Sequence, residues 1–410
     1  MKQGYLSQYF AGAGVKRLSK VEADTIHSNQ HEFNGVRGLR ALLGEPEGHV
    51  RYPARFLYLN DQDDEPVADE GFLTWYEARQ RARIEKGVQR WEYRLYFPTN
   101  LVSQCAAEGD LLVIAKQSDG GLLAIVAESG STIERQLLWL FGFGELTHPG
   151  FSVKSELETE QDRLGFAARV VLETIGIEVV DEAPNYLDEM LRLFGGAFPK
   201  RTEFSDYARR TLRDIDPHTD SDSAIVAWME REEVLFRTLE KHLLAERLQK
   251  LKDERDLDPE AFMSLMQSAQ QRRKSRAGGA LENHLEALFT AHHLTYTREG
   301  ITERKLKPDF IFPGIGRYHD ANFDAARLTM LAAKTTCKDR WRQILNEAAK
   351  IPLKHLITLE PRISEGQTDE MRAENVQLVL PSGLHPTFTG KQQAWLMDVS
   401  DFLKLVRSRQ

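Results

Sequence analysis

Two acidic residues and one lysine in the C-terminal half have the types and surroundings that phosphodiester hydrolysis requires. Asp309 opens an apolar run, Lys334 lies within the next strong one, and Glu347 follows thirteen positions later. A carboxylate at a strand end is open to a hard cation that prefers oxygen ligands. A lysine beside it can stabilise charge on the phosphoryl oxygens or orient the attacking water. We therefore predict that Asp309 and Glu347 bind one Mg²⁺ next to Lys334, with Glu282 as an outer ligand or orienting group.

Each of these features alone also has an ordinary structural explanation. A Pro-Asp pair is a common turn, and a lone lysine in a strand usually lies at an edge or extends to water. The combination is more informative, because 24 residues separate Asp309 from Lys334 and the lysine interrupts the apolar run LTMLAAKTT (328–336).

A charged helix start follows the lysine directly, in KDRWRQILNEAAKI (338–351). Arg340 could donate two hydrogen bonds to guanine, and Asp339 could accept one from cytosine, a pairing suited to G·C-rich DNA. We take four residues here as candidate DNA contacts: Lys338, Asp339, Arg340 and Arg342. The alternative is an exposed helix start capped by Asp339.

A second basic segment precedes another predicted helix, in QQRRKSRAGGALENHLE (270–286). Phosphate or minor-groove contact is expected from four of its cations, with the helix start adding amide donors. These are Arg272, Arg273, Lys274 and Arg276. The alternative is a solvated linker.

The predicted elements that position these residues differ between the two halves. Four strand-like runs occupy the N-terminal half, at 55–59, 91–97, 110–116 and 121–128. The last two are separated by a short turn with Gly120, which predicts a β-hairpin in a sheet-rich or barrel-like module. The C-terminal half has amphipathic helices at 224–249 and 281–294, and then strands at 309–313, 328–336, 354–360 and 376–381. Strands that alternate with helices favour an α/β layer with a mixed sheet.

Length and composition fit two soluble domains. A chain of 410 residues exceeds what one core usually supports, and it has no apolar run long enough to span a bilayer. Two cysteines and the absence of a secretory signal favour a reducing cytoplasm. The net charge of −8 argues weakly against nucleic acid, whereas the basic clusters at 79–94, 271–276 and 334–342 argue for it.

Several of these motifs together resemble the EcoRII-type family of type II restriction endonucleases. The likeness covers roughly 198–385 and includes RRKSRAG, KPDF, the tract AAKTTCKDRWRQILNEAAKI (332–351) and LVLPSGLH. It implies a C-terminal α/β/α restriction-endonuclease-like core, PD-(D/E)xK, with Asp309, Lys334 and Glu347 as the catalytic set. It also makes Glu282 an accessory carboxylate and Tyr318 a nearby polar contributor, and Lys338, Asp339 and Arg340 readers of C·G pairs.

The N-terminal half is similar to the family's effector-DNA domain, a pseudobarrel, at 15–19 and 79–91. The resemblance implies contacts to a second DNA copy from Arg81, Glu85, Lys86 and Arg90. HSNQHEFNG (27–35) is expected to form another arm of that cleft. The family also extrudes a central base pair, for which Trp228 and Arg231 are candidates. Ordinary helix core is the favoured alternative for Trp228.

The sequence thus predicts an effector-DNA domain (1–180), a linker (181–200) and a catalytic domain (201–410). The expected protein is a cytoplasmic, homodimeric, Mg²⁺-dependent endonuclease that cuts both strands of double-stranded DNA. The resemblance further implies a CCNGG-like or CCGG-like site and autoinhibition by the N-terminal domain. Two alternatives stay open: a non-cleaving DNA-binding regulator on a nuclease scaffold, and a nuclease that depends on cytosine modification.

Overall fold

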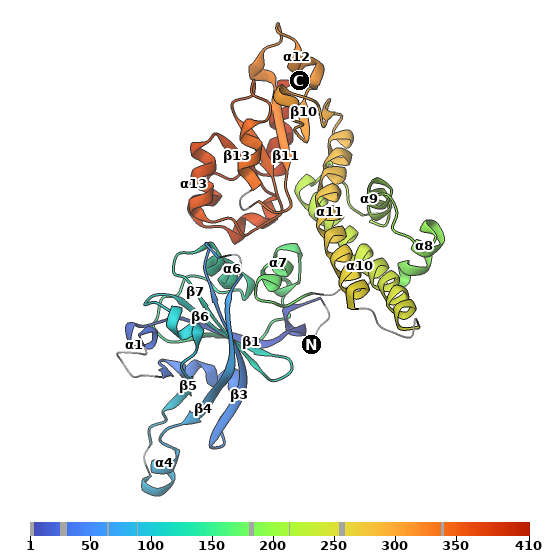
Figure 1. Ribbon diagram of the computed structural model, residues 1–410. Coiled ribbons are helices and arrows are strands. Elements are labelled where there is room, and N and C mark those ends of the chain that lie inside the picture. Colours follow the sequence, from blue (N-terminus) through green and yellow to red (C-terminus); the bar gives the residue numbers. More distant parts are fainter. Residues whose placement is uncertain are drawn as a thin grey trace. The chain divides into compact units, whose positions relative to one another are not determined.

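Two units make up the computed structural model, which describes residues 4–24, 31–63, 65–87, 89–179, 184–212, 214–253, 259–337 and 340–410 (Figure 1). The first unit contains Met1–Glu178 with two later segments, Pro361–Glu365 and Pro386–Thr389. The second contains Val179–Glu360, Gly366–His385 and Gly390–Gln410. None of the helices in these described ranges is long and apolar enough to cross a membrane.

An eight-stranded sheet forms the first unit, in the order β2-β5-β4-β3-β7-β6-β1-β8. All neighbouring strands are antiparallel except β3 and β7. The strands are β1 (Phe10–Arg17), β2 (Glu32–Phe33), β3 (His49–Leu59), β4 (Val67–Glu77), β5 (Tyr93–Tyr96), β6 (Leu111–Gln117), β7 (Leu122–Ala127) and β8 (Ser152–Lys154). The predicted hairpin is β6–β7, closed by a hydrogen bond from Gln117 N–H to the carbonyl of Gly121. This β-rich, pseudobarrel-like unit confirms the expected fold class of the N-terminal half.

One hydrophobic cluster of this unit contains alternate residues of β3, β4, β6 and β7, including Phe56, Trp75, Ile114 and Ala124. Trp75 is fully buried and its indole N–H donates to the carbonyl of Gly44 at 3.0 Å. Short helices surround the sheet: α1 (Lys20–Ala23), α3 (Arg40–Leu43), α4 (Gln80–Lys86), α5 (Leu101–Cys105), α6 (Thr132–Leu140) and α7 (Phe166–Thr174).

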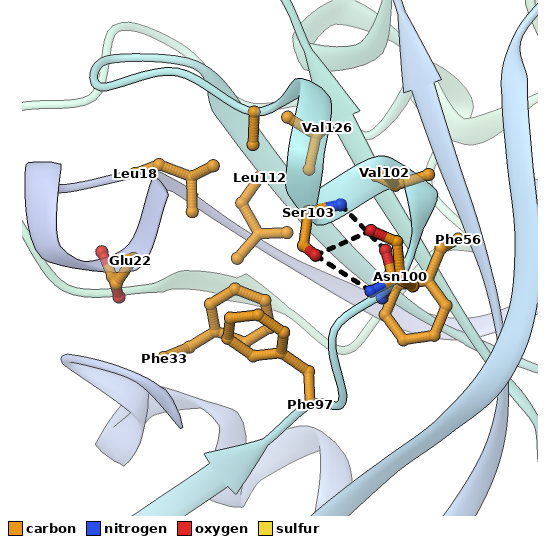
Figure 2. Close-up of a pocket in the computed structure, with 12 residues that line it drawn as sticks. Leu18, Glu22, Phe33, Phe56, Phe97, Asn100, Val102, Ser103, Leu112 and Val126 are labelled. Carbon is orange, nitrogen blue, oxygen red and sulfur yellow. Dashed lines mark hydrogen bonds between the residues drawn. The ribbon is translucent and has the colours of Figure 1, made fainter. Parts of the chain in front are cut away.

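A small apolar cavity remains beside this core (Figure 2). The rings of Phe33 and Phe97 stack against each other in it at a centroid separation of 4.2 Å. Its volume is about 20 Å³, which is room for a single water molecule. One carboxylate lines it, that of Glu22. The cavity is therefore a packing defect and not a ligand site.

Helices dominate the beginning of the second unit: α8 (Pro184–Phe194), α9 (Arg201–Arg210), α10 (Ser221–Asp253) and α11 (Pro259–Ala291). Buried residues of α8 to α10 form one cluster, including Met190, Phe204, Leu235 and Leu239. The stretch that we expected to be a linker, residues 181–200, thus contains a packed helix. Its apolar residues at 3- and 4-residue spacing need a partner surface, and α10 supplies it.

A five-stranded mixed sheet completes this unit, in the order β13-β12-β11-β10-β9. β9, β10 and β11 pair antiparallel, whereas β11, β12 and β13 pair parallel. Phe289 of α11 packs edge-on against Phe310 and Phe312 at 5.1 Å, and Phe402 of α15 (Val399–Arg409) contacts Phe312 at 5.9 Å. The predicted α/β layer is confirmed. Its strands are β9 (Thr297–Arg298), β10 (Phe310–Phe312), β11 (Thr329–Ala333), β12 (Lys354–Ile357) and β13 (Val376–Val379).

The helix predicted over 338–351 is wrong in type. The structure has a 3₁₀ helix at Arg340–Asn346, followed by an irregular turn. Ala348 adopts a left-handed backbone with φ 47°, which ends any helical continuation.

A buried ion pair in the first unit yields a stability prediction. The amino group of Lys16 lies 2.6 Å from Glu22, and both side chains are almost completely buried. The Glu22 carboxylate also accepts hydrogen bonds from Ser19 and from Asn34 N–H. Glu22→Gln should lower the free energy of unfolding by about 3 kcal/mol or more, because it leaves a buried ammonium uncompensated.

Urea unfolding measures this loss. The control is Glu45→Gln, which removes an exposed partner of Arg40 and should change stability by less than about 1 kcal/mol. Equal losses in the two variants would contradict the structural role of the Lys16–Glu22 pair.

Candidate active site

Asp309 immediately precedes β10, and the sheet register determines what it meets. Phe310 pairs with Leu331, so the start of β10 lies beside the end of antiparallel β11. Its carboxylate Oδ2 accepts a hydrogen bond of 2.7 Å from the backbone N–H of Ala333 and one of 3.1 Å from Lys334 Nζ. The backbone carbonyl of Asp309 accepts from Glu299 N–H. One oxygen of the carboxylate is thus fixed by the strand itself.

Lys334 is the first residue beyond β11. Its backbone N–H donates to the carbonyl of Ile357 at 3.0 Å, which extends the parallel pairing of β11 and β12 by one residue. Its side chain and that of Asp309 are each 17% exposed. The pair is therefore sheltered at the edge of the sheet but open to an incoming group.

Glu347 brings a second carboxylate to this place from the turn after the 3₁₀ helix. Burial and the negative charge of Asp309 raise the pKa of Glu347 to about 7, against the opposing effects of Lys334 and Lys354. Its Oε2 atom is buried and has no hydrogen-bond partner. Asp309 and Lys334 are therefore close enough to Glu347 to act on it electrostatically, and one oxygen of Glu347 lacks the hydrogen-bond partner that buried polar atoms usually have.

The two carboxylates supply oxygen donors, the kind that a hard divalent cation prefers. Among the described residues, no cluster of three or more His, Cys, Asp or Glu is suited to hold a metal. Mg²⁺ is commonly held by one or two carboxylates, with waters and substrate phosphates completing its shell. The unpartnered oxygen of Glu347 and the neighbouring Asp309 match that pattern.

Glu282 lies on α11 and is engaged in an ion pair. It accepts from Arg298 at 2.7 Å, and the same guanidinium also binds Glu286 at 2.8 Å and Asn283 at 2.9 Å. Arg298 is in register with Phe310, the residue after Asp309. Glu282 therefore holds strand β9 against α11 through its ion pair with Arg298.

Tyr318, expected as a nearby polar contributor, binds the turn that follows Glu347. Its side chain is fully buried in α12 (Ile315–His319). Its hydroxyl donates to Glu303 at 2.6 Å and accepts from Lys350 N–H at 3.2 Å. Burial, together with the hydrogen bond to Glu303, raises its pKa to about 12. The structure thus makes Tyr318 an anchor for the turn after Glu347.

Of the four expected DNA contacts after Lys334, two lie outside the described residues, Lys338 and Asp339. Arg340 is exposed at the start of the 3₁₀ helix. Arg342 forms an ion pair with Glu370, with both side chains about half exposed. Both described arginines are accessible to a partner.

The basic segment of α11 faces inward more than the sequence indicated. Arg273 donates to Glu240 at 2.6 Å, and Arg276 is buried and paired with Glu232 and Glu233 of α10. The guanidinium of Arg272 lies 4.2 Å from the ring centre of Phe198. For Arg276 the expectation of a phosphate contact is wrong, because its guanidinium is buried against carboxylates of α10. The Arg273 side chain is paired with Glu240 but stays 39% exposed. The Lys274 side chain lies outside the described residues.

The two residues expected in a base pocket, Trp228 and Arg231, make different contacts from α10. Trp228 is only 5% exposed and packs near His284, so it belongs to the helical core. The Arg231 guanidinium instead lies 4.2 Å from the ring centre of Tyr186, and its Nε donates to Thr211 at 2.7 Å. The sequence analysis did not single out Tyr186 as a partner of Arg231, because Tyr186 lies within the stretch taken as a linker.

The expected effector-DNA contacts lie on and after α4, which connects β4 and β5. Arg81 and Glu85 form an exposed pair at 2.8 Å, and Lys86 and Arg90 are exposed. Arg90 also lines an open groove of about 810 Å³ with residues of 31–35 and β5. Residues 27–30, the beginning of the expected second arm at 27–35, lie outside the described residues.

Comparison with known proteins now bears on this site. The family described as EcoRII C terminal matches residues 236–403. The type II restriction enzyme EcoRII from Escherichia coli is 52% identical over 143 residues, which is 35% of each chain. The predicted resemblance to EcoRII-type endonucleases is confirmed for this part of the chain. The match spans only about a third of that relative's length, and Asp309, Lys334 and Glu347 all lie inside the EcoRII-type segment.

Solved structures give a looser likeness. Metal-depleted Ecl18kI in complex with uncleaved, modified DNA has a TM-score of 0.45 at 18% identity, and covers 56% of this chain and 85% of its own. The restriction endonuclease PspGI with substrate DNA has a TM-score of 0.40 at 16% identity, and covers 56% of this chain and 97% of its own.

The raised pKa of Glu347 predicts a pH effect in the metal-free protein. The folded chain keeps the proton to a pH of about 7, whereas the unfolded chain releases it near 4.5. Folding therefore takes up a proton between these values, and the contribution of Glu347 to the free energy of unfolding falls as pH rises from about 4.5 to 7. Glu347→Gln should remove this fall.

Urea unfolding at several pH values, with a chelator present, measures the slope. Glu370→Gln, which removes an exposed carboxylate from the same unit, is the matched control. Equal slopes in the wild type and in Glu347→Gln would contradict the assignment.

Proposed function

We propose that this chain is a Mg²⁺-dependent type II endonuclease that cuts both strands of DNA at a short C/G-rich site, CCNGG-like or CCGG-like. The observation that carries the proposal is the approach of Glu347, with an unpartnered carboxylate oxygen, to the Asp309–Lys334 pair. All three residues lie in the segment that matches the EcoRII C-terminal family.

The chain's own groups have distinct roles in this proposal. Asp309 and Glu347 would hold Mg²⁺, which supplies a lowered pKa for bound water and charge stabilisation at the phosphoryl group. Lys334 remains a cation held at the sheet edge by Asp309, where its ammonium stabilises charge that develops in the transition state. Glu347 must release its proton to act as a ligand, so metal affinity should rise with pH.

Substrate recognition extends the same proposal. Double-stranded DNA is the proposed partner because the matched relative is named a restriction enzyme and similar structures contain DNA. A homodimer would place one active site on each strand of a two-fold symmetric site. Arg340 and Arg342 are the proposed DNA contacts beside the active site. The proposed location of the protein is the cytoplasm.

The N-terminal unit is proposed to bind a second DNA copy and to restrain the catalytic unit. Its exposed cations on and after α4, Arg81, Lys86 and Arg90, support this role. Nearby Glu92 accepts hydrogen bonds from Arg94 and Arg79, which lower its pKa to about 2. The negative charge of Glu92, which lines the open groove, is thus balanced by these two arginines.

Lys334→Ala should abolish cleavage and leave specific DNA binding within about tenfold of the wild type, since the lysine acts mainly in the transition state. Plasmid cleavage in Mg²⁺ and fluorescence binding in Ca²⁺ measure the two properties separately. Lys404→Ala, at an exposed lysine paired with Asp401, is the control and should keep both.

Three outcomes of these assays decide between functions. Loss of binding without loss of turnover would overturn the role of Lys334. A wild-type protein that binds DNA specifically but never cuts would favour a non-cleaving regulator. Cutting of methylated DNA alone would indicate a modification-dependent nuclease.

Deletion of residues 1–180 should leave an active or faster nuclease, because the three proposed active-site residues lie in the second unit. Initial rates on a one-site plasmid, for the full chain and the fragment, measure the effect. A folded fragment without activity would refute autoinhibition by the N-terminal unit.

A further inference from the structure

The turn that carries Glu347 is held by a buried lysine that the proposed mechanism does not use. Lys354 opens β12 and is 5% exposed. Its amino group donates to the backbone carbonyls of Ala348 at 2.8 Å and Ile351 at 2.6 Å. A buried ammonium thus bridges two carbonyls of the turn directly after Glu347.

This turn needs such support because its backbone is strained. Ala348 has a φ of 47°, in the left-handed region that residues with a side chain rarely adopt. Non-glycine residues persist there only when the surroundings fix them. The hydrogen bond from Lys354 to the Ala348 carbonyl acts on the strained residue itself.

Anchors on the other side of the turn come from Glu303 and Tyr318. The Glu303 carboxylate accepts from Ala349 N–H at 3.3 Å, and the Tyr318 hydroxyl accepts from Lys350 N–H at 3.2 Å. The Tyr318 hydroxyl also donates to the same Glu303 oxygen at 2.6 Å, which joins the two anchors. Four backbone groups in residues 348–351 are therefore bound by three side chains.

We infer that Lys354 and Glu303 are positioning residues that aim the Glu347 carboxylate at Asp309 and Lys334. Neither donates to nor accepts from the Glu347 carboxylate through a described hydrogen bond, so they act through the backbone of the turn. The inference rests on the proposed function, because it gives this turn the task of presenting a metal ligand. The positive charge of Lys354 also opposes the raised pKa of Glu347, which places the two groups in one neighbourhood.

Lys354→Met and Glu303→Gln test this role. Each should raise the Mg²⁺ concentration for half-maximal cleavage at least tenfold and leave Ca²⁺-supported DNA binding within about threefold. The second readout uses Mg²⁺ alone: the rise in thermal unfolding midpoint should need correspondingly more metal. Excess Mg²⁺ should restore part of the cleavage rate, which a catalytic residue would not allow. Lys391→Met, at an exposed lysine paired with Asp369, is the control.

A double-mutant cycle separates positioning from general destabilisation. If Lys354 acts through Glu347, then Lys354→Met should not weaken Mg²⁺ binding further in a Glu347→Gln background. Equal losses in both backgrounds would overturn the inference. Because Glu303 is exposed, Glu303→Gln decides the matter if Lys354→Met does not fold.

The two proposals fail in different ways. Unchanged Mg²⁺ dependence in folded Lys354→Met and Glu303→Gln, beside an active wild type, overturns the positioning role alone. A wild type that neither cuts DNA nor is stabilised by Mg²⁺ overturns the proposed function.

Discussion

The antiparallel pairing of β10 with β11 is the constraint on which the candidate site depends. Because Phe310 pairs with Leu331, Asp309 lies close to the end of β11, and its Oδ2 atom accepts hydrogen bonds from both the backbone N–H of Ala333 and the amino group of Lys334. The strand order fixes the acid and the lysine before any cation arrives. Since this pair uses Oδ2, the second oxygen of Asp309 stays available to a metal without loss of the lysine contact.

The third group of the candidate site, Glu347, lies in a locally unfavourable conformation and environment. Glu347 has a buried oxygen without a partner, and the next residue, Ala348, has a left-handed backbone. Both features are unfavourable in the metal-free chain. They persist because a buried lysine, an acid and a tyrosine bind the following turn from two sides. Local strain supported from outside is typical of a site prepared for a ligand, which would supply the missing positive charge.

Strand and hairpin positions could be predicted from the sequence, because alternation and turn residues report local backbone preferences. The trio of Asp309, Lys334 and Glu347 could be proposed as well, since charged groups beside apolar strands are informative. The form of the 340–351 segment could not, because its helical spacing is overridden by the turn at Ala348. Nor could the anchoring role of Tyr318, which depends on a partner fifteen residues away in the chain and on full burial. Tertiary contacts determine the conformation of this segment and the role of Tyr318, and the periodicity of the sequence does not reveal those contacts.

Charge illustrates the same limit, and the structure reconciles the acidic composition with the proposed DNA substrate. A net charge of −8 suggests repulsion from phosphate, and a run such as RRKSR suggests attraction. In the structure, Arg273 and Arg276 of that run form ion pairs with carboxylates of α10. These acidic and basic residues therefore neutralise each other between α10 and α11. Internal pairs of this kind cancel in the field that DNA experiences, and the exposed cations near the active site carry more weight. Arg340, exposed a few residues after Lys334, is therefore more informative about the proposed DNA binding than either the total charge or the densest basic run.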